Sequence, residues 1–403
     1  MKNPQILDLY SDYCVSSFLS VTAVGLSELL NQGYSHDQIS RFFSQRTFDQ
    51  KDFWKFIKRL IRKIEHQEGA ILIDDTISEK PYSTENEHIC YHWDHSKGKS
   101  IKGIQMVNFA YHEPEQSITL PVSFELIKKT EEYYDQKTQK VKRRSPISKN
   151  EIVRQRLYTL TKQNKVLYKY VLWDSWYSSK ENLAFVHQDL KKTFVAALQN
   201  NRTVALSFKD KKQGLFLKVS KLSFTNNLPL KVWLKGLGFP ILLTKQVFKN
   251  KDGSEGELYL ITNDLTMSQD QIFTIYQRRW NVEVFHKSLK QNTALSKSQT
   301  KYEVTQSNHI FASMIAYCKL EILKCKQHLN HFALKSRIYL KAIKAAFDEV
   351  QALKTKVPEI ESYQKSMFTL PDGFYFIQPI FSQLNCLHQH LSILIPKNSS
   401  YQV

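Results

Sequence analysis

The sequence contains few of the residues that disulfide-stabilised or fibrous proteins need. Among 403 residues only 5 are Cys, 11 are Gly and 11 are Pro. Low-complexity and collagen-like structures need far more Gly and Pro, so both are excluded. The Cys residues are odd in number and lack Cys-x-x-Cys spacing, which argues against a disulfide framework and against a zinc site with Cys ligands. Reduced thiols are what we expect of a cytoplasmic protein.

The chain also lacks a long apolar run. The N-terminus reaches Asp8 and Asp12 early, and it therefore lacks the apolar core of a signal peptide. The longest apolar-looking stretch, 15–30, is interrupted by Ser, Thr and Glu and is too short and too polar to span a bilayer. We therefore expect no insertion into a membrane.

Acidic residues are the minority among the charged ones. The chain has 57 Lys and Arg against 38 Asp and Glu, which gives a formal net charge of +19. Such an excess indicates a polyanionic partner, with nucleic acid first and a membrane surface second. The simpler alternative is a basic protein without such a partner. With 42% hydrophobic residues, the chain can bury a sizeable core.

Hydrophobic periodicity divides the chain into five segments. The first, with helical spacing, has a run of Lys and Arg between 51 and 63 that is either a DNA-contacting surface or a solvated one. The segments are 1–66 (helical), 67–201 (first part of an α/β core), 202–256 (β-rich insertion), 257–325 (second part of the core) and 326–403 (helical C-terminal region).

The order of elements predicts an α/β fold. Three strand-like runs, at 70–73, 101–111 and 117–126, precede alternating helices and strands. This order matches a ribonuclease-H-like core, here interrupted by the β-rich insertion and flanked by helical N- and C-terminal regions. The hydrophilic segment 128–150 is expected to be a mobile loop.

Aspartates lie at the predicted ends of two core strands. Asp74 and Asp75 follow a buried apolar run, and Asp174 follows the strand at 166–173. Carboxylates that meet at neighbouring strand ends repel each other unless a cation neutralises them. Mg²⁺ and Mn²⁺ prefer oxygen ligands of this kind. The alternative for each site is an ordinary cap or turn aspartate.

A further set of polar residues has helical spacing. At about 100° per residue, a single helix over 276–290 would place a phenol, a guanidinium, a carboxylate and an ammonium within an arc of about 60°. These residues are Tyr276, Arg279, Glu283 and Lys290, with His286 and Lys287 at the flanks. The alternative is a surface stripe of salt bridges, because Arg279 and Glu283 are an i,i+4 pair.

These residues carry a resemblance to a known family. The spacing Tyr-x2-Arg-x3-Glu-x6-Lys resembles the Tyr-Arg-Glu-Lys (YREK) signature of a large group of bacterial insertion-sequence DDE transposases. ILIDDT at 71–76 and VLWDSWYSSKENL at 171–183 also resemble blocks of that group, as does YHWDHSKGKSIKGIQ at 91–105. The resemblance covers roughly 68–325, and nothing specific is recognised at either end.

The resemblance implies an enzyme that cleaves DNA at transposon ends and transfers the strands into target DNA. Asp74, Asp174 and Glu283 would be the catalytic residues and would hold two Mg²⁺ ions, or Mn²⁺ in their place. Tyr276, Arg279 and Lys290 would bind DNA phosphates. The implied partners are double-stranded DNA, as terminal inverted repeats and target, and a second copy of the chain in a synaptic complex, without a membrane. The implied location is the prokaryotic cytoplasm, at the nucleoid when the protein is bound to DNA.

The sequence departs from the relatives at two places. Successive strand residues point to opposite faces, so only one of Asp74 and Asp75 can be a ligand, and the Asp-Gly-Thr block of relatives favours Asp74. Trp176 stands where many relatives have a small residue. It, or Trp233 in the insertion, could stack on a flipped base during cleavage through a DNA hairpin. A packing role is the alternative for both.

Two other functions stay open at this point. One is a catalytically silent, DNA-binding regulator derived from a transposase, and the other is a ribonuclease-H-type nuclease without end specificity. The presence of all three carboxylates and of the complete Tyr-Arg-Glu-Lys set favours an active transposase.

Overall fold

A computed structural model describes residues 4–94, 97–224, 228–249 and 253–355. The chain forms two compact units, Met1–Ile338 and Tyr339–Val403. Much of the predicted C-terminal region 326–403, including Cys386, lies outside the described residues. Within the described part, Cys14, Cys90, Cys318 and Cys325 are free thiols, and no helix there is long and apolar enough to cross a membrane.

Helices occupy most of the N-terminal segment that ends at Ile64. They are α1 (Pro4–Ser16), α2 (Ala23–Leu29), α3 (His36–Ser44) and α4 (Gln50–Ile64). Asp49 caps α4 in a reciprocal capping box with Asp52, and Phe53, Ile57 and Ile61 form the buried stripe of this helix at four-residue spacing. That stripe places α4 against the strand β4 (Ile118–Leu126), while its Lys and Arg residues face outward.

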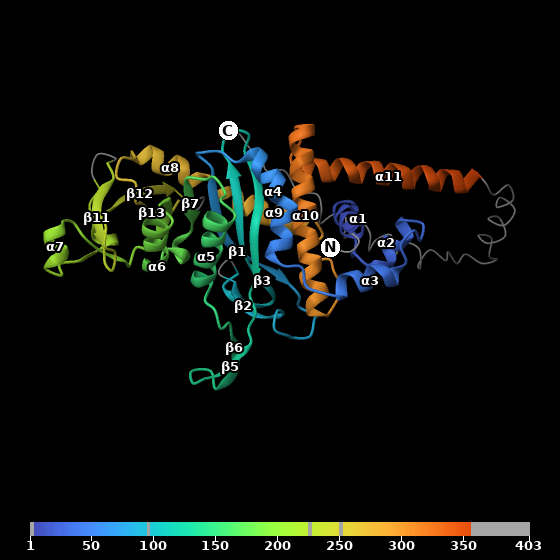
Figure 1. Cartoon of the computed structure of the whole chain (residues 1–403), viewed down its shortest axis with the longest axis horizontal. Helices are drawn as coiled ribbons and strands as arrows, with labels where there is room; N and C mark the ends of the chain where they lie inside the picture. Colours follow the sequence, from blue (N-terminus) through green and yellow to red (C-terminus); the bar gives the residue numbers. More distant parts are fainter. Residues whose placement is uncertain (1–3, 95–96, 225–227, 250–252, 356–403) are drawn as a thin grey trace, which may run out of the picture. The chain divides into compact units, whose positions relative to one another are not determined.

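In the described part of the chain, eleven strands form one mixed sheet (Figure 1). Its order is β10-β9-β11-β12-β13-β8-β7-β1-β3-β2, and β4 also pairs with β3. β1 is parallel to β7, and β7 is parallel to β8, whereas the other pairs are antiparallel. The remaining strands are β1 (Ala70–Glu79), β2 (Cys90–Asp94), β3 (Lys99–Glu113), β7 (Tyr170–Trp173), β8 (Thr193–Leu198), β9 (Thr203–Ala205), β10 (Leu217–Lys218), β11 (Leu230–Leu234), β12 (Ile241–Lys249) and β13 (Glu255–Thr262).

Helices follow and connect these strands, so the fold is a mixed α/β fold. Parallel neighbours need crossover connections, and helices lie in those between β1, β7 and β8. The helices are α5 (Lys149–Tyr158), α6 (Lys180–Ala184), α7 (Phe208–Lys212), α8 (Gln269–Gln277), α9 (Trp280–Asn292), α10 (Glu303–Gln327) and α11 (His331–Thr355).

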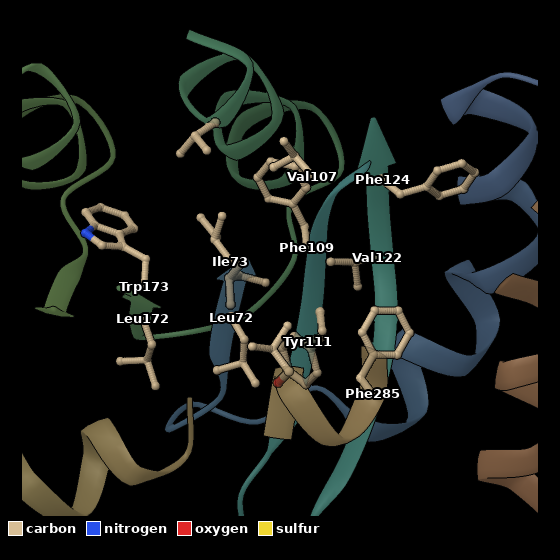
Figure 2. Close-up of a cluster of buried hydrophobic side chains, with 14 of the residues drawn as sticks. Leu72, Ile73, Val107, Phe109, Tyr111, Val122, Phe124, Leu172, Trp173 and Phe285 are labelled. Carbon is tan, nitrogen blue, oxygen red and sulfur yellow. The ribbon is translucent and has the colours of Figure 1, made fainter. Parts of the chain in front are cut away.

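The core is centred on the parallel strands. All four residues of β7 are buried, as expected of a strand covered on both faces. Figure 2 shows Leu72 and Ile73 of β1 beside Leu172 and Trp173 of β7, with Phe285 of α9 in the same cluster. This packing holds α9 against the sheet and thereby determines where the polar residues of α9 lie relative to the strands.

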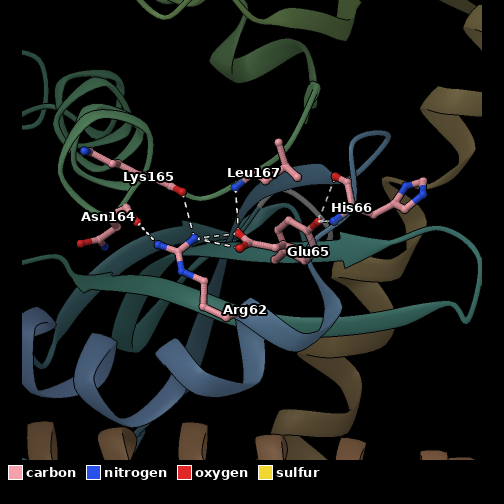
Figure 3. A network of polar contacts seen from close by, with 7 residues as sticks. Arg62, Glu65, His66, Asn164, Lys165 and Leu167 are labelled. Carbon is pink, nitrogen blue, oxygen red and sulfur yellow. Dashed lines mark hydrogen bonds and ion pairs between the residues drawn. The ribbon is translucent and has the colours of Figure 1, made fainter.

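The end of α4 is tied to the loop before β7 by a polar network (Figure 3). Arg62 donates hydrogen bonds to the carbonyl oxygens of Asn164 (2.6 Å) and Lys165 (2.9 Å) and pairs with Glu65. The Glu65 carboxylate in turn accepts a bond from the backbone N–H of Leu167 (3.0 Å). These bonds hold the end of α4 at the edge of the sheet where β7 begins.

The expectation of a loop over 128–150 is wrong. Strands β5 (Glu131–Asp135) and β6 (Lys140–Arg144) form a separate two-stranded hairpin, and α5 begins at Lys149. Glu131 lies opposite Arg144 and pairs with it. Charged cross-strand pairs stabilise this hairpin in place of apolar alternation, so the usual hydrophobic signal for strands is missing.

Candidate active site

Asp74 and Asp174 lie where the parallel pairing of β1 and β7 stops. The last parallel pair is Ile73 with Trp173, and each aspartate is the next residue. β1 itself continues to Glu79, because it keeps pairing with β3 beyond the end of β7. The prediction that Asp74 ends its strand is therefore wrong, although both aspartates still follow the last residue pair between β1 and β7.

The Asp174 carboxylate has a local structural role as well. It caps a short 3₁₀ turn, Ser175–Tyr177, and accepts a hydrogen bond from the backbone N–H of Trp176 at 3.0 Å. Burial raises the pKa of Asp174, while this hydrogen bond and the charge of Arg279 oppose the rise. Asp174 is therefore a turn cap, the alternative considered for it in the sequence, and it also lies beside Asp74.

Asp74 has the more strongly perturbed acidity. Burial, followed by the nearby charges of Asp174 and Asp75, raises its pKa to about 7. A hydrogen bond from the backbone N–H of Asp75 (2.8 Å) and the charge of Arg279 oppose that rise. Neighbouring carboxylates repel each other when both are ionised, and a bound cation relieves that repulsion.

In this structure a protein cation lies beside these carboxylates. The Arg279 guanidinium donates to Glu283 Oε1 at 2.7 Å, and its Nη1 is 3.8 Å from Asp74 Oδ2. Its side chain is only 15% exposed, and its buried Nε has no hydrogen-bond partner among the described residues. Arg279 therefore links the carboxylate of β1 to the carboxylate of α9.

The residues fit a divalent cation in part. Asp74 and Asp174 are half-buried and supply oxygen ligands, which suit Mg²⁺ or Mn²⁺. Glu283 is instead held by Arg279. In the part of the chain that the structure describes, no group of three or more His, Cys, Asp or Glu is placed to hold a metal ion.

The predicted single helix over 276–290 is wrong, because the structure has two. α8 ends at Gln277 and α9 begins at Trp280, and across the joint the N–H of Arg279 bonds to Tyr276 O and that of Val282 to Arg279 O, a tighter i→i−3 pattern. Tyr276 nevertheless stays beside Arg279, whose guanidinium carbon is 5.6 Å from the ring centre. Burial raises the pKa of Tyr276 to about 12.

Lys290 lies further along α9 and is not joined to this group. It is half-buried, and burial lowers its pKa. The charges that act on it most are Asp94, Glu79 and Lys97. The structure thus brings together Tyr276, Arg279 and Glu283 and leaves Lys290 outside their contacts.

Two models of known protein families match this chain. Residues 7–213, just over half of the chain, match the family described as DDE superfamily endonuclease. The chain belongs to the DDE superfamily of endonucleases. Residues 147–319 also match the transposase DDE domain, and no curated protein matches the chain.

Asp75 of this DDE endonuclease has partners of its own. Its carboxylate accepts hydrogen bonds from Tyr177 OH (2.8 Å), Gln105 Nε2 (2.5 Å) and Lys149 Nζ (3.1 Å). These contacts tie β1 to β3, to the first residue of α5 and to the turn that follows Asp174. Sequence reasoning missed all three partners, because each lies far from Asp75 along the chain; Gln105 and Tyr177 lie in the blocks 91–105 and 171–183, but nothing in those blocks shows that they contact Asp75.

Trp176, His286 and Lys287, which the sequence analysis also singles out, differ in exposure. Trp176 is 49% exposed, and Lys149 Nζ lies 5.1 Å from its ring centre. His286 is buried next to Asn108, with 3.0 Å between their side-chain nitrogens, and burial lowers its pKa to about 3. Lys287 is exposed and lies 5.3 Å from the ring centre of Phe332. His286 is therefore part of the core, while Trp176 and Lys287 reach the surface.

The acidity of Asp74 predicts a pH-dependent stability of the metal-free endonuclease. Its pKa is about 7 in the folded state and about 3.9 in an unfolded chain. Its contribution is fully present below the unfolded pKa and is lost as the pH rises through the folded pKa. Between pH 5 and pH 8 we expect the free energy of unfolding, measured with urea in EDTA, to fall by about 2 to 3 kcal/mol from this group.

The variant Asp74→Asn is the control for this prediction. Asparagine has a similar shape but does not titrate, so the loss between pH 5 and pH 8 should shrink by the amount that Asp74 contributes. An unchanged pH dependence in this variant would show that other groups cause the effect.

Proposed function

We propose that this DDE endonuclease is a transposase of the insertion-sequence group with the Tyr-Arg-Glu-Lys signature. It would cleave DNA at the ends of its element and transfer the ends into target DNA by a cut-and-paste route. The observation that carries the proposal is the half-buried pair Asp74 and Asp174, which lies beside the linked Arg279 and Glu283. The match to a transposase DDE domain spans both Asp174 and Glu283 and supports it.

The strand order supports a ribonuclease-H-like core. Strands β4, β3 and β1 form an antiparallel meander, and β7 and β8 extend it in parallel on the other side of β1. We propose that 67–201 and 257–325 are the two parts of this core and that 202–256 is inserted between them. The segment 1–66 would be a helical domain, either DNA-contacting or solvated, and 326–403 a C-terminal region.

In this proposal the catalytic carboxylates are Asp74, Asp174 and Glu283, which would hold two Mg²⁺ ions, or Mn²⁺ in their place. When bound, such ions supply Lewis acidity for in-line displacement at phosphorus. Asp74 and Asp174 are already adjacent, and Glu283 can join them only if Arg279 releases it. Arg279, once released, would bind a DNA phosphate through its paired N–H groups.

The remaining residues would position the DNA. Tyr276 is neutral at physiological pH, so it can donate a hydrogen bond to a phosphate beside Arg279. Lys290 would contact the backbone further along α9, with exposed Lys287 near it. Trp176 would offer an exposed ring for stacking next to Asp174.

Double-stranded DNA, as terminal inverted repeats and as target, is the proposed substrate. Two ends must be brought together, so we propose a homodimer in the synaptic complex. A cytoplasmic location in a prokaryote, at the nucleoid when bound to DNA, fits this substrate.

Cleavage of DNA that carries the sequences flanking this reading frame tests the proposal. A transposase should cut at short inverted repeats in those flanks when Mg²⁺ or Mn²⁺ is present and should join the cut ends to a target plasmid. A duplex with the same flanks in scrambled order is the control. Equal cutting of both duplexes would indicate a non-specific nuclease, and binding without cutting would indicate a silent regulator.

A further inference from the structure

The β-rich insertion carries a large share of the basic charge. Between 202 and 256 the chain has eleven Lys or Arg residues and three acidic residues, so this segment supplies +8 of the net +19. Asp210 accepts a hydrogen bond from Ser207 Oγ at 2.7 Å. The insertion is therefore strongly basic for its length.

Aromatic rings hold part of this charge in place. Phe208 of α7 and Trp233 of β11 pack with their ring centres 5.0 Å apart. The Lys211 ammonium is 4.7 Å from the Trp233 ring centre, and that of Lys212 is 4.8 Å from the Phe208 ring centre. Rings that restrain lysine side chains reduce the rotamer freedom that would be lost on binding an anion.

The outward face of β11 continues the same surface. Val232 and Leu234 are buried, so alternation along the strand turns Lys231 and Trp233 outward, and Lys235 follows at the same spacing. Lys212, Lys231 and Lys235 are exposed and form no ion pair with a carboxylate of the described residues. We call Lys211, Lys212, Lys231 and Lys235, together with Phe208 and Trp233, the lysine face.

The lysine face is separate from the candidate active site. β11 is five strands away from β1 in the sheet order, which corresponds to roughly 24 Å at about 4.8 Å per strand. Figure 1 shows β11 and α7 at the end of the sheet, beyond β12 and β13. A molecule bound at the carboxylates of the candidate active site therefore contacts the lysine face only if it extends over a comparable distance.

We propose that the lysine face binds the phosphate backbone of duplex DNA, independently of its sequence, as a second contact outside the active site. This inference rests on the proposed function only in its choice of polyanion. Restrained ammonium groups without carboxylate partners among the described residues suit phosphates as point-charge contacts. The other polyanion to consider is an anionic membrane, because exposed Leu206 and Leu217 lie in the same insertion.

Salt-dependent binding of a random-sequence 30-base-pair duplex, without divalent metal, tests the proposal. The triple variant Lys212→Gln, Lys231→Gln, Lys235→Gln removes three exposed charges from the lysine face. If each contacts a phosphate, the slope of log K against log salt should become shallower by about 2 to 3, at about 0.9 per contact.

The matched control removes three charges from the edge of the sheet where β7 and β8 begin. Lys162, Lys165 and Lys191 are exposed in segments that precede these two strands, away from the carboxylates. Their change to Gln should alter the slope by less than 1. Equal losses in both triple variants would show that bulk charge alone attracts DNA, and the proposal would fall.

A vesicle arm separates the membrane alternative. Vesicles of phosphatidylcholine and phosphatidylserine at 3:1 should bind the parent protein and the lysine-face variant equally. If the variant loses vesicle binding but keeps its DNA slope, the face is a membrane surface and the proposal is wrong. Neither assay depends on DNA cleavage, so failure of this inference and failure of the transposase proposal give different results.

Discussion

Replacing Asp174 with alanine should abolish metal-dependent cleavage of DNA that carries the element's ends, while DNA binding stays largely intact. The carboxylate is half-buried beside Asp74, and in the proposed function a divalent cation would contact both. Loss of a metal ligand removes several kcal/mol of transition-state stabilisation, and a loss of about 1.4 kcal/mol already slows a reaction tenfold. The cleavage rate, measured by gel in Mg²⁺, should therefore fall by about 10³-fold or more.

The cap formed by Asp174 calls for two further variants. Alanine also removes the acceptor for the Trp176 N–H, which costs about 1 kcal/mol of stability. Asp174→Asn keeps a side-chain oxygen at the cap and removes the charge, so it should fold like the parent and still fail to cleave. Asp49→Ala removes a comparable cap, on α4, and should cleave normally. Cleavage that survives both changes at Asp174 would overturn its catalytic assignment.

The sequence indicates the site best where chemistry and local structure coincide. Asp174 follows a fully buried four-residue strand and begins a turn, so both its position and its cap have a local signal. The place of Asp74 is harder to predict, because the end of its apolar run does not mark the end of its strand. Whether β1 continues depends on its pairing with β3, a later strand that no local pattern at Asp74 reveals.

Other features have no local signal at all. No Pro or Gly interrupts 276–290, and helical periodicity alone cannot reveal a tightened joint at Arg278 and Arg279. The hairpin β5–β6 pairs through charges and lacks the alternation that marks strands. The link from Arg279 to Asp74 joins residues from two distant parts of the chain, so only the folded chain defines it.

Because Arg279 links Asp74 to Glu283, the variant Arg279→Gln should change both the stability of the protein and its affinity for metal ions. Breaking a buried ion pair typically costs about 3 to 5 kcal/mol, but Glu283 is 36% exposed, so we expect a metal-free loss of about 1 to 3 kcal/mol in the free energy of unfolding. Asp74 and Glu283 would then lack their protein cation, and Mn²⁺ would no longer compete with a guanidinium for them.

The variant should therefore bind Mn²⁺ more tightly than the parent, by a factor of ten for each ~1.4 kcal/mol of competition removed. Titration calorimetry measures this affinity, and urea unfolding with and without Mn²⁺ measures the linked gain in stability.

Arg278→Gln is the matched control, since Arg278 donates a hydrogen bond to the backbone oxygen of Glu68 and not to a carboxylate of the candidate active site. Unchanged or weaker Mn²⁺ binding in Arg279→Gln would mean that the guanidinium does not occupy the place of a metal ion. Tighter binding confined to Arg279→Gln would mean that Arg279 must leave the carboxylates before the metal site is complete.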